Sequence, residues 1–113
     1  MKIVDEKVSL SELGQMAENM YGGLVKAVVD VRQNIMGVDA PMHADIESFM
    51  LENGSAQADL WGINLYPDID GEDFLEFDSM INLRPAQGNR SRGIDSSELK
   101  QKIKEIVCSL VSE

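Results

Sequence analysis

The sequence predicts an α+β fold: a single layered domain in which helices pack on one face of a mainly antiparallel sheet. Three observations predict this class. Segments that alternate apolar and polar residues, as strands do, are interspersed with segments of helical periodicity in the order β-α-β-β-α-β-β-α. Glycine, proline and asparagine residues separate these segments, as they do in turns. A chain of 113 residues can bury a self-sufficient core, so residues 1–113 are expected to form one domain.

A short strand and a helix open the chain. Residues 2–4 are predicted to form the strand, and Ser9, followed by Glu12 three positions later, has the capping-box spacing of a helix start. Paired glycines at residues 22–23 are expected to end this helix, because glycine is a poor helix continuer. Its buried stripe is predicted to consist of Leu10, Leu13, Ala17, Met20 and Tyr21.

Two strands follow the first helix. Residues 24–31 alternate apolar and polar side chains, although Val28 interrupts the polar face of the predicted strand. A turn at Gln33-Asn34 is expected to lead into a second, shorter strand at residues 35–38. This part of the sequence therefore predicts a strand, a turn and a strand.

A second helix is predicted to begin near Asp39 and Pro41 and to end at Asn53-Gly54. Its core face would consist of Met42, Ile46, Phe49 and Met50. A strand is the alternative for this segment, because four residues at even positions also fit an alternating pattern. These residues are Met42, Ala44, Ile46 and Met50.

The two most regular strand patterns lie at residues 59–66 and 74–83, joined by a turn-rich connector at residues 67–73. Paired as an antiparallel hairpin, they place apolar side chains on one face and polar side chains on the other. The apolar face would carry Trp61, Ile63, Leu65, Leu75, Phe77, Ile81 and Leu83. The polar face would carry Asn64, Tyr66, Glu76, Asp78, Asn82 and Arg84.

A final helix is expected after Asp95, which is followed three residues later by Glu98 and so fits a capping box. Its buried stripe is predicted to be Leu99, Ile103, Ile106 and Leu110. Cys108 falls opposite Leu99 on this helix, so it is expected to be an exposed thiol or part of an oligomer contact. A single cysteine cannot form an internal disulfide, which agrees with a reducing compartment.

The charge of the chain is strongly acidic, with 20 acidic and 10 basic residues and a formal net charge of −10. Such a surface repels nucleic acid and anionic lipid, so neither is an expected partner. No segment approaches the ~20 apolar residues of a membrane span, and the N-terminus does not resemble a signal peptide. The protein is therefore expected to be soluble and cytoplasmic, with no membrane partner.

The segment from Arg84 to Arg92 is the candidate site, because it contains three of the four arginines and no acidic residue. Its backbone amides, with Gly88 able to adopt positive φ, can form an anion-binding nest, and arginine forks can bind phosphate or carboxylate. The predicted ligand-binding residues are Asn64, Asn82, Arg84, Gln87, Asn89, Arg90 and Arg92. The alternative is a solvated connector whose arginines pair with the protein's own carboxylates.

His43, the only histidine, is a weak candidate for proton transfer. On a helix it would lie one turn from Asp39 and one turn from Glu47, so a metal set of one histidine and two carboxylates is conceivable. A surface ion pair explains the pattern as well, so no metal and no cofactor is predicted. Whether the chain is an enzyme is left open, since Ser91 has no visible histidine base.

The acidic connector at residues 67–73 invites comparison with an EF-hand. With Gly71 as the sixth position of such a loop, Tyr66 and Phe77 would occupy its first and twelfth positions. Neither side chain can supply the required carboxylate. The connector is therefore interpreted as an acidic turn and not as a calcium site.

Three segments of the chain, residues 42–47, 59–67 and 81–92, resemble a known family. The chain is similar, nearly end to end, to the short prokaryotic proteins catalogued as domain of unknown function 5674. This resemblance implies a single domain that spans the whole chain. It adds no activity, substrate or cofactor.

Two functions are compatible with the residues. In the first, the arginine segment and the adjacent polar sheet face bind a small anionic ligand, phosphate or carboxylate, and His43 contributes only if the fold brings it near. In the second, the chain is a non-enzymatic interaction module or homo-oligomer whose arginines bind acidic residues of another protein or a second copy. Both functions need the same exposed guanidinium groups.

Overall fold

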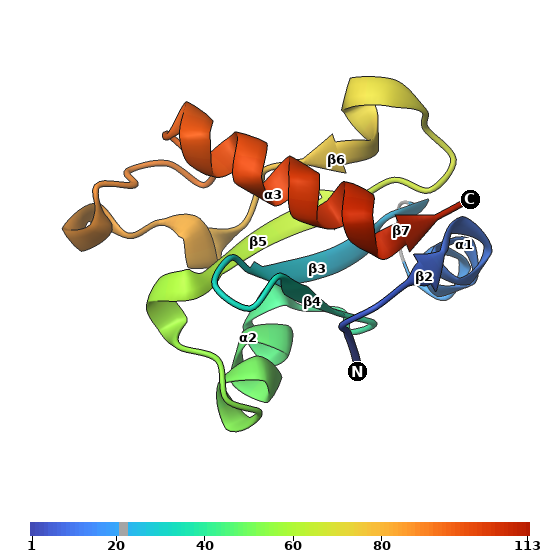
Figure 1. Ribbon diagram of the computed structural model, residues 1–113, viewed down its shortest axis with the longest axis horizontal. Helices are drawn as coiled ribbons and strands as arrows, with labels where there is room; N and C mark the ends of the chain where they lie inside the picture. The colour runs from blue at the N-terminus through green and yellow to red at the C-terminus, as the bar shows by residue number, and fades with distance from the viewer. Residues whose placement is uncertain (21–22) are drawn as a thin grey trace.

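The structure, a computed structural model, describes residues 1–20 and 23–113. It confirms the α+β class: five strands form an antiparallel sheet in the order β1-β4-β3-β5-β6, and helices pack against it (Figure 1). The strands of this sheet are β1 (Lys2–Val4), β3 (Val25–Asp30), β4 (Ile35–Val38), β5 (Leu60–Leu65) and β6 (Leu75–Glu76). The helices are α1 (Leu10–Glu18), α2 (His43–Glu52) and α3 (Ser97–Leu110).

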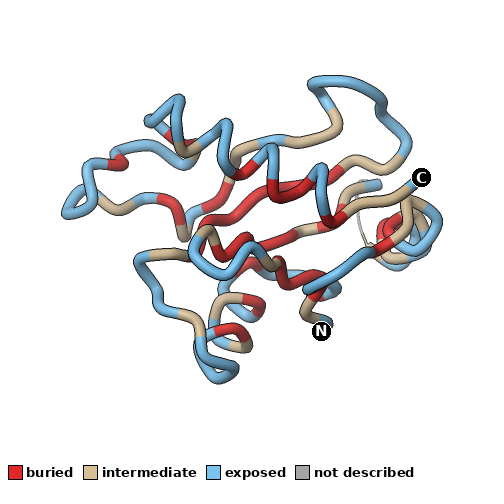
Figure 2. The backbone as a smooth tube through the Cα atoms, viewed as in Figure 1, coloured by how far each residue is buried: buried red, intermediate tan, exposed pale blue. Residues whose placement is uncertain are grey.

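Helices cover both faces of the sheet, which corrects the expectation of helices on one face. Ala27 and Val29 of β3 pack in the cluster that includes the buried residues of α1 and α3. Val28, which lies between them, packs instead with Ile46 and Met50 of α2. Figures 1 and 2 show α2 and α3 on opposite sides of a buried central sheet. The valine that interrupts the polar face in the sequence is thus the sign of a second apolar layer.

The segment before residue 53 is a helix, which decides between the two alternatives for it. α2 begins at His43, later than predicted, because Asp39 has a φ of +71° and stands outside the helix. Met42 is 57% exposed and does not join the core face, which His43 joins instead. The helix packs directly onto β4, since a Cβ added at Gly37 would lie 2.6 Å from Cγ2 of Ile46.

The first helix begins as predicted and ends early. Ser9 Oγ accepts a hydrogen bond from the backbone N–H of Glu12 at 3.0 Å, which confirms the capping interaction. The helix ends at Glu18, with Asn19 as its C-cap, before the paired glycines that were expected to end it. The predicted positions Tyr21 and Gly22 lie outside the described residues.

The N-cap of the last helix is one residue later than predicted. Ser96 Oγ, and not the Asp95 carboxylate, accepts the N–H of Leu99, at 3.2 Å. Cys108 is exposed, as predicted. Val107 joins the predicted stripe, and the buried residues are Ile103, Ile106, Val107 and Leu110. After the helix, β7 (Val111–Ser112) pairs in parallel with β2 (Val8–Ser9), a small second sheet that the sequence did not predict.

The predicted strand at residues 74–83 is mostly wrong. Only β6 pairs with β5, and a 3₁₀ turn, η4 (Met80–Asn82), follows. The reason is a side chain: Asn82 accepts from the N–H of Gly62 at 2.8 Å and donates to its carbonyl at 2.9 Å. This carboxamide takes the place of a pairing strand, so the chain crosses β5 and does not extend the sheet. A Cβ at Gly62 would lie only 2.6 Å from Cβ of Ser79.

Candidate functional site

The arginine segment folds back on itself as a tight turn. Arg84 N donates to Asn89 O at 2.8 Å, and Asn89 N donates to Arg84 O at 3.1 Å. The short η5 helix (Pro85–Gln87) lies between them, and Gly88 closes the turn with the predicted positive φ, at +81°. A residue with a Cβ is disfavoured in this conformation, so glycine allows the turn to form.

Asn89 fixes the turn from inside. It is 4% exposed, and its Nδ2 lies within 3.1 Å of the carbonyl oxygens of Asn82, Ser91 and Gly93. Its Oδ1 accepts from the N–H of Asp95 at 2.8 Å. Both ends of this carboxamide are therefore bonded within the chain. Asn89, which was predicted to bind a ligand, therefore holds the loop together through these bonds.

A carboxylate of the chain occupies the amide that was predicted to receive an external anion. Asp95 accepts from the backbone N–H of Arg90 at 2.7 Å and from the hydroxyl of Ser91 at 2.6 Å. The Ser91 hydroxyl and then the Arg90 N–H hold the pKa of Asp95 below its usual value. One amide of the loop is therefore bonded to Asp95, which the sequence suggested as a helix cap, and the anion-binding nest stays a prediction.

Arg84 is a structural residue of the loop. Its Nε donates to Ile81 O at 2.8 Å, and its two terminal nitrogens donate to Gln57 O, at 2.7 Å, and to Leu60 O. The guanidinium also lies 4.5 Å from the centroid of Trp61, in cation–π contact. With an exposed side-chain fraction of only 10%, Arg84 has little surface left for a ligand.

The charge of Arg84 is balanced by Glu47 of α2. Arg84 Nη2 lies 3.6 Å from Glu47 Oε2, whose side chain is 15% exposed. Burial lowers the pKa of the guanidinium, and Glu47 opposes this effect; an arginine remains charged at neutral pH. Gln87 joins the same cluster by accepting from Arg84 at 3.3 Å and donating to Ala58 O at 3.2 Å.

Arg90 and Arg92 are the two arginines of the segment whose side chains are exposed. Arg90 is exposed, and its guanidinium makes no ion pair or hydrogen bond with any residue that the structure describes. Arg92 Nε lies 2.9 Å from Asp78 Oδ1, with both side chains largely exposed at 57% and 42%. The backbone of Arg92 is fixed, because its carbonyl accepts from Ser79 N at 2.9 Å and Asn82 Nδ2 at 3.0 Å.

Two exposed apolar side chains lie in the segment beside these arginines. Met80 is 63% exposed and Leu83 is 43% exposed, although Leu83 was predicted to face the core. The bonds of Ser79 and Asn82 to the Arg92 carbonyl hold their segment against the arginine segment. We call the four side chains of Met80, Leu83, Arg90 and Arg92 the cationic loop surface.

His43 is buried, at 7% exposure, and its Nε2 lies 2.7 Å from the carbonyl oxygen of Ile63. Since a carbonyl only accepts, this nitrogen carries the proton and donates. Burial lowers the pKa of His43; the charges of Lys26 and Arg92 add to this effect, while the Ile63 bond and Asp78 oppose it. The ring is therefore neutral at pH 7.

Glu47 lies one turn after His43 on α2, as predicted, but the two predicted carboxylates do not form a metal set with the ring. Asp39 precedes the helix, and Glu47 pairs with Arg84. Within the described residues, no three histidine, cysteine, aspartate or glutamate side chains are grouped as a metal ion would require. The one-histidine, two-carboxylate set is therefore not assembled.

No helix in the described part of the chain is both long and apolar enough to cross a membrane.

Asn64 forms a separate polar group with its predicted neighbours on the sheet. It pairs in register with Glu76, donating to Oε1 at 2.8 Å, and Tyr66 donates to the same oxygen at 2.9 Å. Partial burial and then the Glu76 carboxylate raise the pKa of Tyr66. Asn64 is only 5% exposed, so it is an internal residue and not part of an open polar face.

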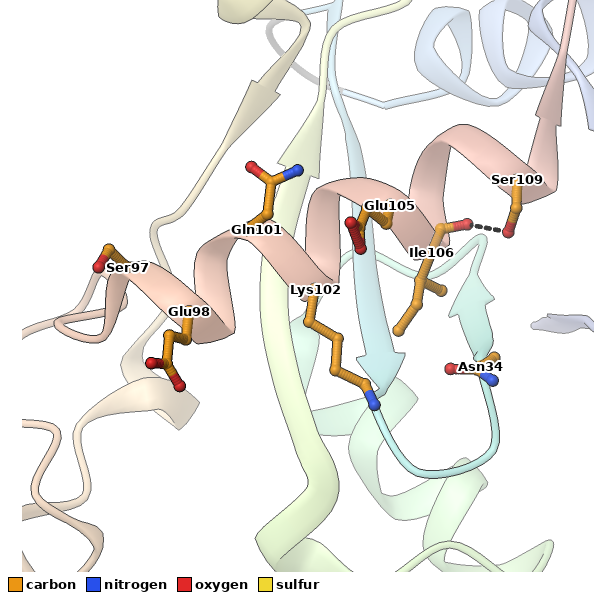
Figure 3. A pocket seen from close by; sticks show the side chains of 8 residues that line it. All are labelled: Asn34, Ser97, Glu98, Gln101, Lys102, Glu105, Ile106 and Ser109. Carbon is orange, nitrogen blue, oxygen red and sulfur yellow. Dashed lines mark hydrogen bonds between the residues drawn. The ribbon is translucent and has the colours of Figure 1, made fainter.

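An open groove of about 690 Å³ lies between α3 and the turn that joins β3 to β4 (Figure 3). Its lining residues are Asn34, Ser97, Glu98, Gln101, Lys102, Glu105, Ile106 and Ser109, and none is a predicted candidate. Glu98 and Lys102 lie four residues apart on the helix, a spacing typical of a solvated face. Figure 3 shows Lys102 extending from α3 toward the turn that carries Asn34. The groove therefore resembles a hydrated surface.

Comparison with known proteins gives one match. A family model described as "Protein of unknown function (DUF5674)" matches residues 2–110, nearly the whole chain. Neither the curated proteins nor the solved structures give a match. The family description names no activity, so a function has to be argued from the geometry of the loop.

Proposed function

This chain belongs to the DUF5674 family of proteins of unknown function, and we propose that its cationic loop surface binds anions that carry a phosphate or carboxylate group. Arg90 and Arg92 supply the binding groups, because a planar guanidinium can donate two parallel hydrogen bonds to either kind of anion. Long side chains two residues apart can converge on one such group.

One observation carries the proposal: the loop satisfies its own polar groups and leaves these two guanidinium groups outside. Asn82 and Asn89 are 0% and 4% exposed and bonded within the chain. The backbone that presents Arg90 and Arg92 is fixed by Asp95 and by Ser79. A rigid platform lowers the entropy cost of binding, because only the arginine side chains must be ordered.

The acidity of the remaining surface limits how an anion can bind. A net charge of −10 repels anions, but charges farther away than a Debye length of about 8 Å at physiological salt are largely screened. Binding must therefore depend on short-range contact with the guanidinium groups. Asp78 is an internal competitor, because it already pairs with Arg92 at 2.9 Å.

The proposal is tested by titrating the ¹⁵N-labelled chain with phosphate and, in a second arm, with acetate, against chloride at the same ionic strength. We expect saturable amide shifts in residues 88–95, with dissociation constants on the order of 1 mM. Either oxyanion should act, because both match the guanidinium fork. Shifts that chloride reproduces at equal ionic strength would contradict the proposal.

Arginine variants provide the matched comparison. Arg90→Ala and Arg92→Ala should abolish the shifts without unfolding the loop, because both residues bond to it through their backbone. Arg32→Ala is the control: this fourth arginine is 65% exposed and pairs with Asp59 at 3.4 Å, outside the loop. Asp78→Asn should tighten binding by up to about five-fold, the worth of one surface ion pair. Equal binding by the Arg90 and Arg32 variants would refute the assignment.

A further inference from the structure

We infer that the carboxylates bound by the cationic loop surface are those of residues 68–73 in a second copy of this chain. This inference rests on the proposed anion binding and names the partner of the same site. It predicts that the protein self-associates through two different surfaces. Residues 68–73 are called the acidic turn below.

The acidic turn is an exposed group of carboxylates without partners in its own chain. Its acidic residues are Asp68, Asp70, Glu72 and Asp73, and all four are exposed. None of these side chains makes an ion pair or hydrogen bond with another residue that the structure describes. Asp70 stands at the N-cap position of the 3₁₀ turn η3 (Gly71–Phe74) but does not bond to it. These carboxylates can therefore form ion pairs with cationic groups of another molecule.

The two surfaces are complementary in composition as well as charge. The acidic turn carries one exposed apolar side chain, Ile69, at 43%. In the cationic loop surface, Met80 and Leu83 are exposed on the segment that Ser79 and Asn82 bond to the carbonyl of Arg92. Methionine, arginine and large apolar residues are enriched in protein interfaces. An acidic segment that also carries an exposed apolar residue matches a cationic segment that is bonded to exposed apolar residues.

The two surfaces do not meet within one molecule. Figure 1 shows the acidic turn, in yellow, and the arginine segment, in orange-brown, at opposite ends of the molecule. Within the described residues, no ion pair or hydrogen bond joins a carboxylate of the acidic turn to Arg90 or Arg92. Contact is therefore only available between molecules, and a second copy always supplies the complementary surface. Two copies packed antiparallel could make both contacts at once, as in a two-fold dimer.

The charge of the chain makes one variant decisive. Replacing the four acidic side chains of the turn by their amides changes the net charge from −10 to −6. General electrostatic repulsion between copies would then weaken, so non-specific association should increase. The inference predicts the opposite result, a loss of association. The substitutions are Asp68→Asn, Asp70→Asn, Glu72→Gln and Asp73→Asn.

Sedimentation equilibrium of the full chain, at concentrations up to about 1 mM, measures this association. We expect the turn variant to associate roughly ten-fold more weakly than the wild type, and Ile69→Ser to associate more weakly as well. The matched control is Glu98→Gln with Glu105→Gln on α3, which also reduces the acidity but lies outside both surfaces. Stronger or unchanged association of the turn variant would overturn the inference.

Mixing two defective variants tests which surfaces meet. Arg90→Glu with Arg92→Glu removes the cationic surface and keeps the acidic turn, whereas the turn variant does the reverse. Each variant alone should associate roughly ten-fold more weakly than the wild type, but an equimolar mixture should form a complex more readily than either, because each variant supplies the surface that the other lacks. A mixture that sediments as two monomers would overturn the inference.

The phosphate titration separates this inference from the proposed function. The turn variant retains Arg90 and Arg92, so phosphate should still shift its residues 88–95. A wild-type chain that is monomeric at every concentration but still binds phosphate would overturn the second-copy partner alone. A monomeric chain without phosphate-dependent shifts would overturn both the partner and the anion site.

Discussion

Replacing Arg84 by methionine is expected to lower the free energy of unfolding by about 3 to 5 kcal/mol, the usual effect of breaking a buried ion pair from one side. Methionine keeps the apolar stem of the side chain, so the change isolates the guanidinium. The substitution leaves Glu47, 15% exposed, without its cation at 3.6 Å. It also removes the cation–π contact with Trp61.

The hydrogen bonds of Arg84 support the same magnitude. Its guanidinium donates to the carbonyls of Ile81, Gln57 and Leu60, and each bond from a charged donor contributes about 1.5 to 3 kcal/mol. Their sum exceeds the expected loss, because the arginine itself is desolvated in the folded chain and because such terms are not additive.

Urea denaturation followed by far-UV circular dichroism is the assay, since fluorescence of Trp61 would change with its contact to Arg84. Arg90→Met is the control and should change stability by at most about 0.5 kcal/mol, because its side chain is exposed. A double-mutant cycle with Glu47→Gln should give a coupling energy of about 1 kcal/mol or more. A loss below about 1 kcal/mol for Arg84→Met, or no difference from Arg90→Met, would refute the structural role.

Two further predictions concern the packing and the pH dependence of stability. Gly62→Ala should lower the free energy of unfolding by about 1 to 3 kcal/mol, because its Cβ would lie 2.6 Å from Ser79 Cβ. In α1, the Cβ of Gly14→Ala would meet nothing within 4 Å. This control should raise the free energy of unfolding by roughly 0.5 to 1 kcal/mol, because alanine favours the helix more than glycine does. Equal effects in thermal denaturation would contradict this assignment. Burial lowers the pKa of His43 below 6.5 in the folded chain. The contribution of the neutral ring to the free energy of unfolding is therefore fully present above pH 6.5 and is lost as the pH falls through the folded-state pKa. Denaturation between about pH 7.5 and pH 5 should show this loss in the wild type and a flatter profile in His43→Gln; parallel profiles would argue against it.

Local signals account for most of the elements that the sequence predicted correctly. The bond from Glu12 N to Ser9 Oγ depends on residues three positions apart, and the turn at Gly88 depends on one residue's conformational freedom. Such features need no knowledge of distant residues. For the helix before Asn53, local signals predicted the end but left a strand as the alternative, and the structure decided for the helix.

The strand predicted at residues 74–83 failed for a non-local reason. Its alternating pattern is compatible with a strand, but the Asn82 carboxamide bonds to Gly62, twenty residues earlier. Glycine at that position leaves the space that Ser79 fills. Only the packed chain shows that a side chain replaces the neighbouring strand.

The roles of the three clustered arginines could not be separated by their positions. Arg84, Arg90 and Arg92 carry the same charge, and each was a candidate ligand residue. Arg84 became structural because Glu47 and Trp61 come to lie around it from two other elements. The other two stay at the surface because Asp95 and Ser79 bind their backbone and not their side chains.

The sequence by itself determined the α+β class, the three helices and the one cationic segment of an acidic chain, because these depend on periodicity and composition along the chain. The tertiary structure decided that helices cover both faces of the sheet and that Asp95 accepts from the Arg90 amide and the Ser91 hydroxyl. It also decided that, of the clustered arginines, Arg84 is enclosed while Arg90 and Arg92 are exposed. These outcomes depend on which distant residues come into contact, and burial favours contacts that give most buried polar groups a hydrogen-bond partner.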